Sequence, residues 1–382
     1  MKKILFAAIC LLLAVFISIA LFVRLRYGGG QTGFPDRTSS PVFDGDVLEI
    51  AADLMVPHGN LAVSEDGRLF FSFHPEARPD IRVAEWRDGI VVAYPNDAYQ
   101  GPGKQDVHFD TVLSVRIDAK NRLWTLDLAN HGIGQPRLLA FDLSSDSLVH
   151  QFDFPKEYAG FGSHLNDFQI DSAAETIYIA DASIFAKTPA ILVYDIATRT
   201  CRRLLENHPS VIPDPYIPVV QGRVMQIFGI FAVRPGVDSI ALDKSGHWLY
   251  FAPVTSHYMY RIRAADLKDA TLSPHELSQR VEKFAEKTMS DGLTMDVDGN
   301  IYITDIENSA IVRLTPEGDL ETIVKDDRIR WPDGLGFGPD GWLYVTCSAL
   351  HQVIGRTPGQ MQSNAPFQIY RFKPGIQGVP GQ

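Results

Sequence analysis

The segment SDGLTMDVDGNIYITD, residues Ser290 to Asp305, has two short apolar stretches separated by a turn rich in Asp, Gly and Asn. Alternating apolar residues before the turn and a β-rich run with an aromatic residue after it are typical of a strand, a tight turn and a second strand. The pattern recurs five more times, in His58–Phe73, Val112–Asp127, His164–Asp181, Gly236–Pro253 and Trp331–Ser348. Such self-similarity predicts a repeat architecture.

The aligned aromatic residues of the six copies lie 42 to 72 residues apart. They are Phe70, Trp124, Tyr178, Tyr250, Tyr302 and Tyr344. One four-stranded sheet per copy fits this spacing, and six sheets closed into a ring leave only short, protected edges. We therefore predict an all-β fold, a six-bladed β-propeller. The stretch Asp46 to Ile50 is expected to add an N-terminal strand to the last blade, beside Gln368 to Phe372.

An apolar segment precedes this body. Ile4 to Val23 form 20 consecutive uncharged positions, long enough to span a bilayer, whereas the apolar region of a secretory signal usually has about 7–15 residues. We predict a transmembrane or signal-anchor helix in residues 1–27, with the body on the periplasmic or extracellular side. Secretion after signal cleavage is the alternative. Residues 28–44 are predicted to form a flexible linker, 45–374 the propeller and 375–382 a C-terminal tail.

The net negative charge of the body indicates which classes of partner it can bind. The anchor segment contains four of the 35 basic residues and no acidic one, which leaves 31 basic against 46 acidic residues in the rest of the chain. Such a body repels the phosphates of nucleic acids and of anionic lipid surfaces. We expect no nucleic-acid partner, contact with the membrane through the N-terminal helix, and a small-molecule ligand.

Two departures from the repeat stand out. The longest spacing contains Pro209, Pro213, Pro215 and Pro218, and a long ordered connection is either a functional lid or an irregular surface excursion. Ser273–Thr288 begins with a capping-box pattern and a proline in the first helical turn, and it predicts a short helix.

Candidate functional residues come from one register of the repeats, five positions before the turn. The innermost strands of a propeller line its central channel, so this register converges on the channel mouth. It contains Gly59, Leu113, Asn166, Asp238, Asp291 and Asp333. We predict that the last four bind a ligand, because carboxylates and an amide suit a hard cation such as Ca²⁺, an ammonium group or sugar-like hydroxyls.

The other repeated acids are expected to be structural. Aspartates at the turns and at the ends of the second strands usually accept hydrogen bonds from nearby backbone N–H groups. These are Asp118, Asp171, Asp243 and Asp296 at the turns, and Asp127, Asp181 and Asp305 after the aligned aromatics. His164, two residues before Asn166, is the preferred candidate for a catalytic general base.

The sequence resembles the major royal jelly protein/yellow family over about Val47 to Phe372, as a compact, bacterial-type member. The motifs that carry the resemblance include SVRIDAKNRLWTLD (Ser114–Asp127), LNDFQID (Leu165–Asp171) and WPDGLGF (Trp331–Phe337). The resemblance implies a six-bladed propeller, distantly similar to gluconolactonase-like propellers. It also implies an aromatic or amine ligand, which the protein binds and, in a dopachrome-tautomerase-related reaction, converts.

The similarity to gluconolactonase-like propellers implies a divalent metal held by a Glu, an Asn and an Asp. Asn166 matches the Asn position and Asp238 or Asp291 the Asp position, so Asn166 and Asp291 are the predicted metal ligands. The Glu position falls near His58 and Gly59, where the sequence has no carboxylate. Three hypotheses follow: a small-molecule-binding propeller, a metal-dependent lactonase, and a non-catalytic interaction platform.

Overall fold

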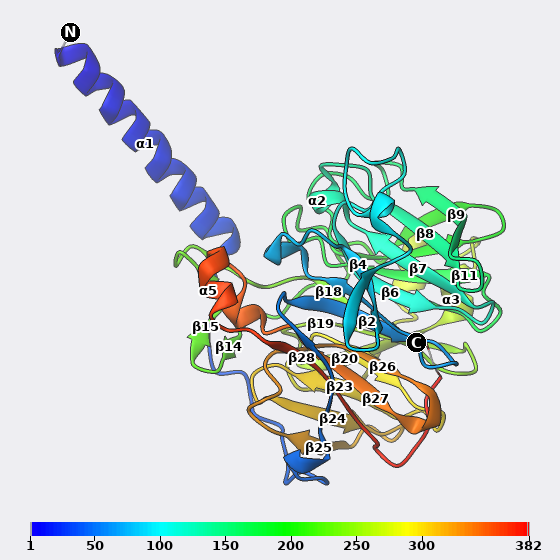
Figure 1. Ribbon diagram of the computed structural model, residues 1–382. Coiled ribbons are helices and arrows are strands. Elements are labelled where there is room, and N and C mark those ends of the chain that lie inside the picture. The colour runs from blue at the N-terminus through cyan, green and yellow to red at the C-terminus, as the bar shows by residue number, and fades with distance from the viewer. Residues whose placement is uncertain (1, 380, 382) are drawn as a thin grey trace.

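The computed structural model describes residues 2–379 and 381 (Figure 1). Met1 of the predicted anchor and Pro380 and Gln382 of the predicted tail lie outside the described residues. Over the described part, the chain forms a long N-terminal helix, α1 (Lys2–Tyr27), that projects away from a β-rich body. The body contains six four-stranded antiparallel sheets, as the six repeats predict.

Five of the six sheets, or blades, are built from consecutive strands, each pairing with the next. They are β2 (His58–Val63), β3 (Leu69–Phe73), β4 (Val83–Arg87) and β5 (Ile90–Ala93); β6 (Val112–Ile117), β7 (Arg122–Asp127), β8 (Arg137–Asp142) and β9 (Ser147–Asp153); β10 (Leu165–Ile170), β11 (Thr176–Asp181), β12 (Ala190–Asp195) and β13 (Thr200–Leu204); β18 (Val237–Leu242), β19 (Trp248–Pro253), β20 (Tyr258–Arg263) and β21 (Glu282–Glu286); and β22 (Leu293–Met295), β23 (Ile301–Asp305), β24 (Ala310–Leu314) and β25 (Leu320–Lys325).

The sixth blade joins the two ends of the body. Its inner three strands are β26 (Pro332–Phe337), β27 (Leu343–Cys347) and β28 (Phe367–Phe372), and its outermost strand is β1 (Glu49–Leu54), which pairs antiparallel with β28. The predicted N-terminal closing strand is therefore present, and it begins three residues later than Asp46. The innermost strands pack in sequence around the axis, and β26 packs beside β2, so the ring is closed.

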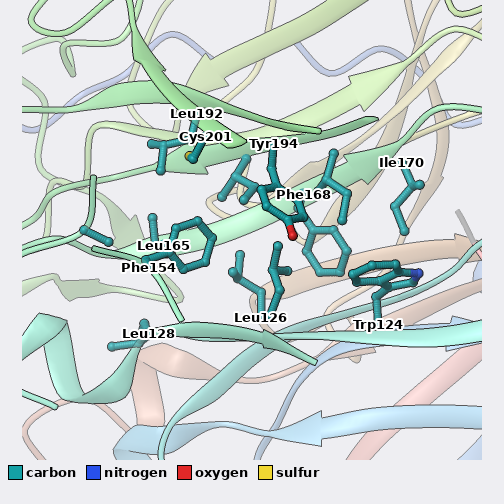
Figure 2. Close-up of a cluster of buried hydrophobic side chains, with 14 of the residues drawn as sticks. Trp124, Leu126, Leu128, Phe154, Leu165, Phe168, Ile170, Leu192, Tyr194 and Cys201 are labelled. Carbon is teal, nitrogen blue, oxygen red and sulfur yellow. The ribbon is translucent and has the colours of Figure 1, made fainter. Parts of the chain in front are cut away.

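The aligned aromatic residues explain why the repeat is visible in the sequence. Each sits in the second strand of its blade, and all six are at most 8% exposed. Figure 2 shows one such contact layer, in which Trp124 and Leu126 of β7 face Phe168 of β10 and Tyr194 of β12. Because a flat sheet face must be covered by its neighbour, one large side chain per blade fills the wedge between blades.

Short helices and hairpins lie in the connections between the strands. The helices are α2 (Ala129–Gly132), α3 (Ala264–Lys268), α4 (Pro274–Ser278) and α5 (Pro358–Gln362). The capping box of Ser273 and Glu276 is present, so the predicted helix is confirmed at its start. Its second half was wrongly predicted, since Glu282–Glu286 is the edge strand β21. Pairing with β20 overrides the helical preference of this charged segment.

Residues 28–44, predicted as a flexible linker, lie along the body. Phe34 is 8% exposed, and its ring stacks on His257 with centroids 4.6 Å apart. Phe43 forms a parallel bridge with Val324 of β25. The segment between β13 and β18 contains two small hairpins, β14 (Val219–Val220) with β15 (Arg223–Val224), and β16 (Gln226–Ile227) with β17 (Phe231–Ala232).

The closing strand provides the first prediction. Leu54, at the end of β1, is 1% exposed and packs in the cluster that contains Phe71 and Ile369, whereas the adjacent Met55 is 65% exposed. Leu54→Ala should lower the free energy of unfolding by about 2–5 kcal/mol, because it leaves a cavity at the ring closure. Met55→Ala should change it by less than about 0.5 kcal/mol. Urea denaturation of the full chain in detergent measures both values, and equal effects would contradict the proposed importance of this closure.

Candidate ligand-binding site

The candidate register lies at irregularities of the innermost strands. The register of pairing shifts between His58 and Leu61, Val112 and Ser114, Leu165 and Phe168, Val237 and Ser239, and Pro332 and Leu335. A bulge re-aims side chains and often lies beside a functional site. In the fifth blade Asp291 stands just before β22, and the hydroxyl of Thr304 accepts hydrogen bonds from the backbone N–H groups of Asp291 and Gly292.

All six register positions line one cavity of about 150 Å³ at one end of the channel. A cavity of this size is large enough for a benzene-sized group. Its floor is polar and includes Asn166, Asp238, Asp291 and Asp333. Its wall is apolar and aromatic and comes from loops outside the repeat. The wall residues are Ile184, Phe185, Ile227, Phe231, Val233, Val254, Leu350 and Ile354.

The long insertion between β13 and β18 supplies much of this wall. Ile227 and Phe231 belong to the second hairpin, and Pro218, Val233 and Pro235 also line the cavity. The ring of Phe231 lies 5.7 Å from that of Phe185. The segment that the sequence predicts as a lid or a surface excursion therefore covers one side of the cavity.

The carboxyl groups of the floor contact one another. The side-chain amide of Asn166 donates a hydrogen bond to Asp238, and the carboxyl groups of Asp238 and Asp291 are hydrogen-bonded to each other. Two carboxyl groups can share a hydrogen bond only when one is protonated. The indole N–H of Trp331 donates to a carboxyl oxygen of Asp291 at 2.5 Å, which favours the ionised form of Asp291. Burial and the charge of Asp291 raise the pKa of Asp238 well above its ordinary value, so we assign the shared proton to Asp238.

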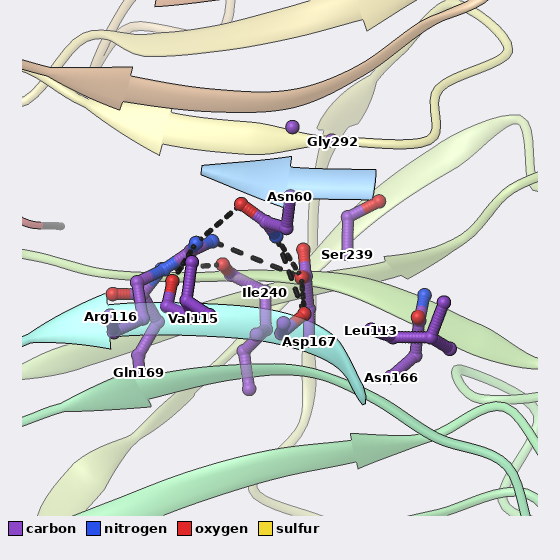
Figure 3. Close-up of polar contacts among 12 residues, drawn as sticks. Asn60, Leu113, Val115, Arg116, Asn166, Asp167, Gln169, Ser239, Ile240 and Gly292 are labelled. Carbon is purple, nitrogen blue, oxygen red and sulfur yellow. Dashed lines mark hydrogen bonds and ion pairs between the residues drawn. The ribbon is translucent and has the colours of Figure 1, made fainter. Parts of the chain in front are cut away.

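A fourth carboxyl group of the cavity, that of Asp167, is held in a buried polar network (Figure 3). One oxygen of Asp167 accepts hydrogen bonds from Asn60 at 2.6 Å and from Ser114 at 2.7 Å, and the guanidinium of Arg116 lies 3.9 Å away. Arg116 is 1% exposed and donates to Asn60 at 2.7 Å. This network fixes the inner strands of the first three blades relative to one another.

The site contains more buried acid than buried base. Burial and the neighbouring carboxylates, Asp291 foremost, raise the pKa of both Asp238 and Asp333 well above the usual value. The buried ammonium of Lys287 also acts on Asp238, but burial lowers the pKa of Lys287 to about 7. Of the four carboxyl groups, those of Asp167 and Asp333 interact with the guanidinium of Arg116, and an added cation near the other two would be stabilised.

His164 also lines the cavity, beside His131 and His74. The Nδ1 atoms of His164 and His131 are 3.0 Å apart. Burial lowers the pKa of His164 well below its ordinary value and that of His74 to about 4, so these imidazoles are neutral at pH 7. His164 can accept a proton from a ligand in this state, and its role as a general base stays a prediction.

The resemblance to gluconolactonase-like propellers puts their glutamate near His58 and Gly59, and Gly59 lines the cavity without a side chain. A Cβ atom there would lie 2.8 Å from the hydroxyl of Ser72, so a larger residue would not fit without movement. Among residues 2–379 and 381, no three His, Cys, Asp or Glu side chains are placed to share a metal ion. This observation does not concern the amide of Asn166, and the ligand role of Asn166 and Asp291 toward a metal stays a prediction.

The repeated aspartates are structural, as predicted. Asp118, Asp171, Asp243 and Asp296 each accept backbone hydrogen bonds within their own turns. Asp127, Asp181 and Asp305 do the same at the loops that follow the second strands. Asn60, Arg116, Phe185 and Phe231 were not predicted from the sequence as site residues. Asn60 follows the register residue Gly59, Arg116 lies in the SVRIDAKNRLWTLD motif and Trp331 begins the WPDGLGF motif.

A closed ring of six four-stranded sheets around an axial cavity defines a six-bladed β-propeller. The family model described as major royal jelly protein matches residues 110–379. The chain belongs to the major royal jelly protein family.

Individual matches agree with this assignment. The chain is 26% identical over 212 residues to major royal jelly protein 3 of Apis mellifera, which covers 53% of this chain and 37% of that protein. The chain spans half or less of the length of the first curated relatives it matches.

Solved structures share the fold at low identity. A luciferin-regenerating enzyme superimposes with a TM-score of 0.56 at 13% identity and covers 88% of this chain and 98% of its own. The calcium-binding protein regucalcin of Agrobacterium tumefaciens gives a TM-score of 0.54 at 14% identity, with 90% and 98% coverage. At these identities the similarity to the solved structures shows the fold alone.

The buried carboxyl pair provides a prediction about stability. Because the pKa of Asp238 is raised in the folded state, folding binds a proton between the ordinary and the raised pKa, and stability falls as pH rises through that window. Asp238→Asn imitates the protonated form. It should therefore raise the free energy of unfolding at pH 8 by about 1 kcal/mol or more, and the gain should disappear toward pH 4.

Asp243→Asn is the matched control, since Asp243 follows the same strand and holds a turn by accepting from the backbone N–H of His247 at 2.7 Å. This variant should give no gain at pH 8. Thermal denaturation between pH 4 and pH 8 measures both variants. A loss of stability in Asp238→Asn at pH 8 would show that the carboxylate is stabilising and would contradict the assignment.

Proposed function

We propose that this protein binds a small aromatic amine in the axial cavity, with the ammonium group on the carboxyl floor and the ring against the aromatic wall. The observation that carries the proposal is the group of carboxylic acids at the floor, where burial and the neighbouring carboxylates raise the pKa of Asp238 and Asp333 well above the usual value. An ammonium group beside them would favour their ionised form, and a charge-assisted hydrogen bond is worth more in a partly buried site than in water.

The wall favours an organic cation over a bare metal ion. Phe185, Phe231 and Trp331 surround the upper part of the cavity, and aromatic faces attract cations and pack against flat rings. A hydrated divalent ion would gain nothing from this surface. The similarity to the royal jelly/yellow family adds the same ligand class as an expectation.

The floor also has the groups that a proton-transfer reaction requires. Asp238 can donate a proton and Asp291 can accept one, and both face the cavity. In the tautomerisation of an aminochrome such as dopachrome, one base removes a proton from carbon and one acid delivers a proton to the ring system. The bonding electrons shift within the ring, so no oxidant or reductant is needed. We propose this pair as the acid and base of such a conversion.

A matched pair of ligands tests the binding proposal. Dopamine and 3,4-dihydroxyphenylethanol differ only in carrying an ammonium or a hydroxyl group. We expect dopamine to bind about tenfold or more tightly, a difference of about 1.4 kcal/mol, because only its ammonium group can balance the acids. Its affinity should rise with pH as Asp238 and Asp333 ionise, until the amine itself loses its proton. Isothermal titration of the full chain in detergent measures both.

Asp291→Asn should remove the preference for the amine, while Asp243→Asn should keep it. Equal binding of the two ligands to the unchanged protein would contradict the proposal. A rise of the melting temperature with Ca²⁺ that Asp291→Asn abolishes, together with no response to dopamine, would instead favour the metal-dependent hypothesis.

The conversion proposal has a separate test. The protein should accelerate the decay of dopachrome absorbance, and Asp238→Asn and Asp291→Asn should each slow the catalysed rate by about 100-fold or more, the usual contribution of an acid or base. His164→Gln should be compared, since His164 is the alternative base. Unchanged rates in both aspartate variants would exclude the carboxyl pair from the reaction.

A further inference from the structure

The foot of the N-terminal helix is joined to the rim of the cavity. The last turn of α1 makes three side-chain hydrogen bonds to carbonyl groups of the surrounding loops: Arg24 to Gly229 (2.7 Å), Arg26 to Ala186 (3.1 Å) and Tyr27 to Phe185 (2.8 Å). The ring of Tyr27 also stacks on Phe231, with centroids 5.2 Å apart. Phe185 and Phe231 line the cavity, so one side chain separates the helix from the ligand site.

The length of α1 indicates how far the cavity rim would lie from the surface of a bilayer. Among the described residues, α1 is the one helix long and apolar enough to cross a membrane. Its uncharged run, Ile4 to Val23, has 20 residues and would span about 30 Å, the thickness of the hydrocarbon core. Arg24 to Tyr27 would then lie at the headgroups. The cavity rim contacts these same residues and would lie within about one helical turn of the lipid surface.

Three large apolar side chains stand exposed around the rim, and we call them the mouth patch: Ile133, Phe161 and Phe228, which are 66%, 79% and 89% exposed. Each is tied to the foot of α1 or to the cavity through its neighbours. Phe228 precedes Gly229, which Arg24 contacts. Phe161 precedes Gly162, whose carbonyl accepts from the backbone N–H of Ala186 at 3.1 Å. Ile133 follows the cavity-lining His131 by two residues.

Positive charge collects at the same place, although the body as a whole is acidic. The ammonium of Lys187 lies 5.3 Å from the ring of Tyr27 and donates to the carbonyl of Arg234. Arg24 and Arg26 complete the group. Aromatic and basic residues around an apolar surface are the composition that binds the headgroup region of a bilayer.

From this continuity between helix, mouth patch and cavity, we propose that the propeller docks on the bilayer with its cavity mouth facing the lipid, so that ligand enters from the membrane interface. The proposal extends the proposed function, because it states where the amine-binding cavity opens, and it rests on α1 being embedded in a bilayer. The occupant of the mouth patch is the lipid surface of the leaflet from which α1 emerges. Amphipathic amines concentrate in that layer.

Depth-dependent quenching tests the docking with the full chain in lipid vesicles. Of the three cysteines, Cys201 and Cys347 are buried and Cys10 lies in α1. With Cys10→Ser as background, an environment-sensitive dye is placed at Phe161→Cys, at Phe228→Cys and, as the control, at Ser172→Cys. Ser172 lines the depression formed by the strand turns at the other end of the channel. A separate sample of the protein without substitutions, labelled at Cys10, reports whether α1 is embedded.

Phosphatidylcholine vesicles carrying a nitroxide just below the headgroup should quench the dyes at 161 and 228 at least about twofold, because the mouth patch would be buried to about 5–10 Å. The dye at 172 should be unaffected. Quenching at Cys10 without quenching at 161 and 228 would overturn the docking. An unquenched Cys10 would overturn its premise, the embedded anchor. Neither result affects the dopamine titration, which is done in detergent, so docking and amine binding fail independently.

Replacing both Phe161 and Phe228 by serine gives a second readout on a folded protein, since both side chains are exposed and little packing is lost. With the dye at Ile133→Cys, this double variant should lose most of the lipid quenching while its affinity for dopamine in detergent stays unchanged. Retained quenching would overturn the role of the two aromatic residues.

Discussion

The convergence of six innermost strands on one axis determines most of what is distinctive about this protein. A closed ring brings backbones so close that side chains have no room at several positions. A Cβ atom on Gly292 would lie 1.7 Å from the carbonyl oxygen of Asp333 in the next blade. The innermost strands contain bulges at this point, and the bulges direct short polar side chains toward the axis. Once turned inward, carboxyl groups from separate blades lie close together with few cations around them.

The fold was readable from the sequence because each blade solves the same packing problem. An aromatic residue such as Trp124 or Tyr302 is buried between blades, and an aspartate such as Asp118 or Asp296 holds the preceding turn. Because every blade has to meet these two requirements, the same residue types recur at the same positions of each repeat. The strand β21 was missed for the opposite reason, since Glu282–Glu286 is a peripheral edge whose charged sequence says little about its partner.

Only part of the candidate site was predictable from the sequence. The shared register identified Asn166 and Asp238, but a bulge breaks the alternation of a strand, so Asn166 and its neighbour Asp167 both line the cavity. In a regular strand, neighbouring side chains point to opposite sides, and only one of these two residues would face the cavity. The wall was not predictable, because Phe185 and Phe231 belong to loops with no counterpart in the other blades. What distinguishes this propeller from others of its fold lies in those loops.

The pairing of β1 with β28 joins residues about 320 positions apart, Ile50 with Tyr370 for example. No other strand can take the place of β1 at the edge of the sixth blade, so the ring stays open until the C-terminal strand has been made. For a chain that emerges N-terminus first, β1 is made long before β28 and stays without this partner while the strands between them form. An interrupted chain that lacks β28 would leave β1 as an unpaired, exposed strand.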